Sequence, residues 1–172
     1  DSIHQNPKRK SWSPLAPGFG ATPNHFGPEL AFGRHLRDAW PDRRVAIIKV
    51  AEGGTTLQTD WRARKGRLYE RLVDDVRRQM EVLSSKKGRP RLLGMAWMQG
   101  ESDAYGEAAE AYEKNLRDFF EAFRADLNRP DLPVTIGLIA PIPRWRRHET
   151  IRAAQESVAE TLDHANTVDT AG

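Results

Sequence analysis

Short, nearly continuous apolar runs alternate along this chain with longer segments of helical periodicity, and this alternation restricts the fold more than any other feature. The runs at 45–50, 92–98 and 134–140 have the composition of parallel strands covered on both faces, and one more strand is expected to start within 167–169. Apolar residues recur at helical spacing elsewhere, which predicts helices over 28–39, 68–83, 107–124 and 149–162. The alternation predicts an α/β fold of three layers, αβα, with a mainly parallel sheet.

The composition is that of one globular domain, expected to extend over residues 1–172. Residues 1–27 are rich in Pro, Gly, Ser and Asn and are predicted to form a long loop. The 27 basic residues are offset by 24 acidic ones, which argues against a nucleic-acid-binding surface. No apolar run approaches the ~20 residues of a membrane span. Without cysteine, the chain has neither thiol catalysis nor disulfides.

Polar segments that contain glycine follow two of the predicted strands directly. Gly53-Gly54-Thr55 comes shortly after the run at 45–50, and Gln99-Gly100-Glu101 follows the run at 92–98. In open parallel sheets, ligands bind outside the carboxyl ends of the strands. We therefore expect both segments to face one substrate crevice.

Two strings carry a resemblance to a known family: WMQGESD at 97–103 and AEGGTTLQTDW at 51–61. They resemble motifs of the sialate O-acetylesterase-like branch of the SGNH hydrolases, which includes the acetylxylan esterases of carbohydrate esterase family six. Shorter matches follow in the family's order, among them GPE at 27–29, RADL at 124–127 and LPV at 132–134. The resemblance implies a flavodoxin-like fold. It also implies hydrolysis of acetyl esters on a sugar or polysaccharide through a serine acyl-enzyme, with no cofactor, in a secreted or periplasmic enzyme.

Hydrolysis through an acyl-enzyme needs donors for the oxyanion that develops in the transition state. The side-chain amide of Gln99 is one candidate donor, and a backbone N–H of Gly53 or Gly54 is the other, with Gly54 slightly favoured. The resemblance implies the same roles for the glycine and the amide. Glu101 is expected to accept hydrogen bonds from loop backbone, and so to hold Gln99 and the Gly-Gly turn in place.

Three further residues are predicted to contact substrate: Thr55, Trp61 and His148. Trp61 has two open roles, either presenting its face to a sugar ring or packing the turn against the sheet. His148 lies in the loop predicted after the strand at 134–140. The five histidines lack the spacing of metal ligands, so no metal site is predicted.

Two motifs of the family have no counterpart in this sequence. The family's nucleophilic serine stands in a Gly-Gln-Ser-Asn string near the start, and its Asp-x-x-His motif lies near the end. We therefore expect an esterase domain that is incomplete at both ends and inactive on its own. A second hypothesis is a non-catalytic glycan-binding relative of the same fold. A third uses Glu101 and Asp103 as general acid and base.

Overall fold

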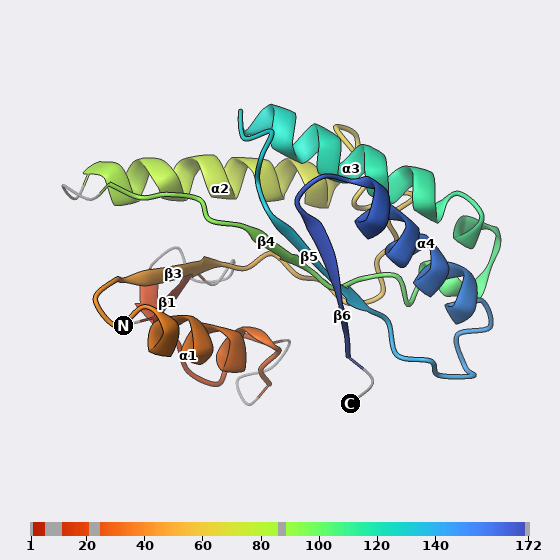
Figure 1. Cartoon of the computed structure of the whole chain (residues 1–172), viewed down its shortest axis with the longest axis horizontal. Helices are drawn as coiled ribbons and strands as arrows, with labels where there is room; N and C mark the ends of the chain where they lie inside the picture. The colour runs from red at the N-terminus through yellow and green to blue at the C-terminus, as the bar shows by residue number, and fades with distance from the viewer. Residues whose placement is uncertain (1, 6–11, 21–24, 86–88, 171–172) are drawn as a thin grey trace. The chain divides into compact units, whose positions relative to one another are not determined.

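A computed structural model describes residues 2–5, 12–20, 25–85 and 89–170 of the chain (Figure 1). The chain separates into two compact units, Asp1–Glu52 and Gly53–Gly172, and each is described by itself. The single domain expected from the sequence therefore stays a prediction. None of the described helices is long and apolar enough to cross a membrane.

The first unit contains a three-stranded sheet and one helix, α1 (Glu29–Ala39). Strand β1 (Ser2–Gln5) lies in the middle of the sheet, antiparallel to β2 (Trp12–Pro14) and parallel to β3 (Val45–Ile48). The predicted loop over 1–27 is thus wrong at β1 and β2. Their sequences show little alternation of polar and apolar residues, and it is pairing with neighbouring strands that stabilises them.

A partly buried ion pair joins α1 to the residue that follows β3 in this unit. Lys49 Nζ lies 2.8 Å from Glu29 Oε1 and also donates to the carbonyl of Phe19. Burial raises the pKa of the Glu29 carboxyl, but hydrogen bonds from Lys49 and from the Gly27 N–H outweigh burial, and the net pKa lies below its ordinary value. Glu29 therefore stays ionised at the start of the helix, where negative charge is favourable.

The second unit contains a fully parallel sheet of three strands in the order β4 (Met95–Trp97), β5 (Val134–Leu138) and β6 (Ala165–Asp169). Its helices are α2 (Arg67–Ser85), α3 (Tyr112–Asp126) and α4 (His148–Thr161), and α3 packs beside α4 (Figure 1). Two short 3₁₀ turns, η1 (Asp103–Tyr105) and η2 (Glu107–Ala109), precede α3. The predicted α/β class with mainly parallel strands is confirmed. The strands at 92–98 and 134–140 are shorter than predicted, and the helix predicted from 107 begins as η2.

An aromatic cluster fills the core between β4 and α3. The ring of Trp97 on β4 lies 4.4 Å from that of Phe119 on α3, measured between centroids, and Trp61 meets Trp97 edge-on at 5.2 Å. Each such pair adds about 0.5–1.5 kcal/mol beyond the burial of its surface. The predicted apolar stripe of α3 is confirmed, because all of its members are buried: Tyr112, Leu116, Phe119, Phe120 and Phe123.

Candidate active site at the end of β4

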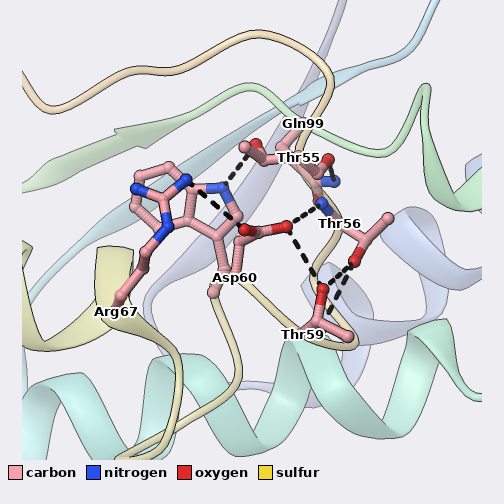
Figure 2. A network of polar contacts seen from close by, with 7 residues as sticks. Thr55, Thr56, Thr59, Asp60, Arg67 and Gln99 are labelled. Carbon is pink, nitrogen blue, oxygen red and sulfur yellow. Dashed lines mark hydrogen bonds and ion pairs between the residues drawn. The ribbon is translucent and has the colours of Figure 1, made fainter.

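The segment 53–66, which opens the second unit, is folded back on itself around Asp60. The Asp60 carboxylate accepts hydrogen bonds from the Thr56 N–H at 3.0 Å and from the Thr59 hydroxyl at 3.2 Å. Arg67, at the start of α2, approaches its other oxygen at 3.5 Å. Figure 2 shows Asp60 between Arg67 on one side and the two threonines on the other. The Asp60 carboxylate thus accepts hydrogen bonds that a backbone carbonyl would otherwise accept, and so fixes the shape of the loop.

Gly66 closes this loop at a place where no side chain fits. A Cβ atom at Gly66 would lie 2.3 Å from the carbonyl oxygen of Asp60 and 2.6 Å from the nitrogen of Arg62. The Gly66 N–H donates to the Arg62 carbonyl at 2.7 Å. The loop therefore depends on a backbone approach that only glycine allows.

The two glycines proposed from the sequence lie exposed at the start of the segment. Gly54 has φ +75°, a conformation that favours glycine, whereas a Cβ atom at either position would meet nothing within 4 Å. Among the described residues, neither N–H has a hydrogen-bond partner. Both remain open as donors, and the backbone conformation favours glycine specifically at Gly54.

Gln99, directly beyond β4, is buried, and its side chain is fully engaged as a donor. Nε2 donates to the Thr55 carbonyl at 3.1 Å and to Asp103 Oδ2 at 2.6 Å. The backbone carbonyl of Gln99 accepts from the Tyr112 hydroxyl at 2.8 Å and from Gln155 Nε2 at 3.0 Å. The structure thus brings two predicted site residues, Thr55 and Gln99, into direct contact (Figure 2).

Asp103 lies beneath Gln99 with no exposed surface. Besides Gln99, it accepts the Leu57 N–H at 2.9 Å and the Gln58 N–H at 3.4 Å. Burial raises the pKa of the Asp103 carboxyl, while the hydrogen bonds from Gln99 and the loop N–H groups partly offset that rise. Hydrogen bonds among four residues therefore fix the Gln99 carboxamide: Thr55, Leu57, Gln99 and Asp103.

The structural role expected for Glu101 is therefore filled by Asp103. The chain turns after Gln99, with the Ala104 N–H bonded to the Gly100 carbonyl at 3.0 Å, and this turn brings Asp103 back under the amide. Glu101 is half-buried and makes no hydrogen bond to another described residue. The acid–base pair of Glu101 and Asp103 is not supported either, since Asp103 is sealed from substrate by its loop donors.

Gly100 allows this turn. Its φ is +140°, and a Cβ atom there would lie 2.7 Å from Ile151 Cγ2 and 3.1 Å from the Tyr112 hydroxyl oxygen. Both the conformation and the lack of space require glycine. The glycine after Gln99 thus lets the chain reverse against α3 and α4.

Trp61 adopts the packing role that the sequence left open. Its side chain is 4% exposed, and its Nε1–H donates to the Thr55 hydroxyl at 3.0 Å. Thr55 is also buried, with its carbonyl on Gln99 and its hydroxyl on Trp61. These two residues therefore support the Gln99 carboxamide from behind by packing and hydrogen bonding, and contact of Thr55 with substrate stays a prediction.

His148 is the first residue of α4 and not a loop residue, so its predicted placement is wrong. The helix begins one residue earlier than its apolar periodicity indicates, because Arg147 is the N-cap and its carbonyl accepts the Ile151 N–H at 3.1 Å. The neighbouring Arg147 N–H donates to the Ala104 carbonyl at 2.9 Å, which holds this end of α4 against η1. His148 is half-buried there, and its contact with substrate stays a prediction.

Within the described ranges, no three His, Asp or Glu side chains come together in a way that could hold a metal ion. The chemistry that this arrangement offers is hydrogen-bond donation, from the side-chain amide of Gln99 and from the N–H groups of the glycine turn.

Residues 4–172 match the family described as carbohydrate esterase, sialic acid-specific acetylesterase. The chain belongs to this family.

One curated relative of this chain is a probable carbohydrate esterase of Arabidopsis thaliana, and the two are 32% identical over 111 residues. The match takes in 63% of this chain, and the chain spans 40% of the length of that relative.

Solved structures of other proteins show the same fold. A protein of Arabidopsis thaliana superposes with a TM-score of 0.80 at 24% identity, over 99% of this chain and 68% of its own. A carbohydrate acetylesterase from Xanthomonas citri gives 0.70 at 14% identity, over 99% and 42%. NanS gives 0.65 at 22% identity, over 91% and 55%. At these identities the likeness establishes the SGNH-like esterase fold of the family member and nothing finer.

Two residues that hold the site were missed in the sequence. From the sequence, Tyr112 is expected on the apolar face of its helix and in the motif order of the family, without a role at the site, and no motif points to Gln155. Gln155 is fully buried between the buried apolar residues of α4, and its Oε1 accepts the Ile139 N–H at 3.1 Å. A lone amide side chain next to the apolar face of a helix was the available signal, because buried polar groups need partners.

Proposed function

We propose that this chain forms the oxyanion-binding part of a carbohydrate O-acetylesterase that works through a serine acyl-enzyme. The observation that carries the proposal is the Gln99 carboxamide, buried directly beyond β4 and fixed against the Gly53–Thr55 turn by its bond to the Thr55 carbonyl. Membership of a carbohydrate esterase family supports an acetylated carbohydrate as the substrate. The nucleophilic serine, the histidine and the aspartate are proposed to lie outside these 172 residues.

The chemistry follows from the two N–H groups of Gln99 Nε2. A serine oxygen attacks the acetyl carbonyl carbon, and the carbonyl oxygen becomes an oxyanion that needs donors before alcohol leaves. The bond to the Asp103 carboxylate is short and charge-assisted, whereas the bond to the neutral Thr55 carbonyl is longer. The N–H on Thr55 therefore has the weaker partner, and in the proposed mechanism this N–H exchanges the Thr55 carbonyl for the oxyanion while the other N–H stays on Asp103.

A backbone N–H of the glycine turn is the proposed second donor. Gly54 is preferred to Gly53, because its positive φ calls for glycine at that position, whereas Gly53 has no such requirement. Loss of one such donor costs about 10²–10³-fold in kcat in esterases and proteases of this type. The identity of the acetylated sugar, whether a sialic acid, xylan or another glycan, depends on loops that these donors do not specify.

The test is acetate release by the gene's full-length product from an aryl acetate, an O-acetylated sialic acid and acetylated xylan, each with and without a serine-reactive phosphonate. We expect release that the phosphonate abolishes, and no release by the 172-residue chain alone. Strong turnover by the 172-residue chain would contradict the placement of the nucleophile. A folded full-length product that binds glycan but releases no acetate would instead support the glycan-binding alternative.

A further inference from the structure

We propose that Asp103 is the positioning residue that decides which end of the Gln99 carboxamide faces the substrate oxygen. The proposal rests on the proposed function of Gln99 as an oxyanion donor. Asp103 itself is fully buried and touches no substrate. It acts by accepting the hydrogen bond from Gln99 Nε2 at 2.6 Å.

The orientation of a carboxamide is set by its neighbours, since its two ends have nearly the same shape but opposite hydrogen-bonding character. The NH₂ end of Gln99 faces two oxygen atoms, Asp103 Oδ2 and the Thr55 carbonyl. The Oε1 end is buried and has no partner among the described residues. Turned over, Gln99 would place Oε1 against two oxygens, so the acceptors enforce the observed orientation.

Of these two acceptors, only Asp103 presents a side chain, and an ionised carboxylate has no hydrogen to donate. Asp103 is in turn held by the Leu57 and Gln58 N–H groups. Since those donors belong to the segment that follows the glycine turn, one carboxylate sets both the amide direction and the position of the loop. The geometry thus links the two proposed oxyanion donors through a single buried residue.

The substitution Asp103→Asn separates positioning from packing. Asparagine has the same shape, and its Oδ1 can still accept from Leu57. Its Nδ2, however, carries a hydrogen where Gln99 Nε2 needs an acceptor, and the Gln99 carboxamide is expected to turn so that Oε1 accepts from it. The variant should therefore fold with its oxyanion donor reversed.

A first experiment measures the amide directly in the 172-residue chain by ¹⁵N-edited NMR, with exposed Gln58 as an internal reference. We expect the Gln99 side-chain NH₂ protons to exchange with water far more slowly than those of Gln58. In D103N this slow exchange is lost, whereas in the matched variant D126N, whose carboxylate shares no partner with Gln99, it is kept. Exchange of the wild-type Gln99 amide as fast as that of Gln58 would overturn the proposal, even if D103N does not fold.

A second experiment measures the kinetics of the full-length product. D103N is expected to lower kcat for an aryl acetate on the order of 100-fold with little change in KM, and D126N to leave both nearly unchanged. Unaltered kcat in a folded D103N protein overturns the proposal. A wild-type product without esterase activity removes the proposed function and this role with it, while slow amide exchange would still establish the Asp103–Gln99 geometry.

Discussion

The hydroxyl of Tyr112 lies 2.8 Å from the backbone carbonyl oxygen of Gln99 and donates a hydrogen bond to it. Burial raises the pKa of Tyr112, so the hydroxyl keeps its proton and remains a donor at neutral pH. Gln155 donates to the same oxygen at 3.0 Å. The backbone of the proposed oxyanion residue is thus held from α3 and α4 at once.

Removing this donor with Y112F should lower the free energy of unfolding by about 1 kcal/mol, because the Gln99 carbonyl keeps its bond from Gln155. Chemical denaturation of the chain measures the loss. Y105F is the matched control, since Tyr105 is exposed and the same change should have little effect there. Equal stability of Y112F and wild type would mean that the bond contributes nothing.

Replacing the amide itself should act on the chemical step. In the full-length product, Q99L is expected to lower kcat by about 10²–10³-fold against an aryl acetate, because a donor used in the transition state is lost. Some stability is lost as well, since Asp103 keeps a buried charge with one donor fewer. Q58L changes an exposed glutamine of the segment 53–66 in the same way and should retain activity. A Q99L enzyme as fast as Q58L would exclude Gln99 as an oxyanion donor.

The turn after Gln99 should not tolerate a methyl group. G100A is expected to lower the free energy of unfolding by about 2 kcal/mol or more, because it adds backbone strain at φ +140° to a clash with Ile151. G106A is the control: Gly106 has an extended backbone, φ −154°, and a Cβ atom there meets nothing within 4 Å. Thermal melts of both variants compare the two sites. A G100A protein as stable as G106A would show that the turn relaxes easily.

Acid should weaken the second unit through Asp126. Arg64 donates to this carboxylate from Nε and from its terminal nitrogen at 2.8 Å, and so does the Tyr69 hydroxyl at 2.5 Å; these bonds hold the pKa of Asp126 below its ordinary value. The stabilisation is therefore complete above about pH 4, the ordinary value for Asp, and is lost as the pH falls through the lowered pKa.

The measurement is urea denaturation of wild type and D126N at several pH values between pH 7 and pH 2. Wild type should be the more stable at neutral pH, and the difference should shrink in acid. D118N removes the charge of a half-exposed aspartate that pairs with Lys114 on the same helix, and it serves as the control for charge alone. A difference between wild type and D126N that grows in acid would contradict the assigned sign.

The helices of the second unit were predictable, because their apolar residues follow a clear period and bury one face each. Strands β4 and β5 were predictable from their nearly continuous apolar runs, whereas β6, which has few apolar residues, starts at Ala165 and not within 167–169 as expected. The position of Gln99 after a buried strand was predictable from the run that forms β4. Strands β1 and β2 were not, since short polar strands take their stability from partners that lie far along the sequence.

The partner of Gln99 was assigned to the wrong acid. From the sequence, Glu101 and Asp103 are equivalent neighbours of the amide, and the choice between them depends on how sharply the chain turns at Gly100. Only the turn's hydrogen bond from Ala104 to Gly100 makes residue 103 the one that returns beneath Gln99. The burial of Trp61 was likewise undecided, because a tryptophan suits a core and a sugar-binding surface equally well.

Gln155 bonds to the Gln99 carbonyl although the two residues stand 56 positions apart in sequence. A substitution that slides α4 by a fraction of an ångström would therefore pull on the proposed oxyanion residue without touching substrate. If the proposed function holds, variation on the buried side of that helix is a way to tune the rate remotely, and a search for faster or slower variants has reason to begin there as well as around Gln99.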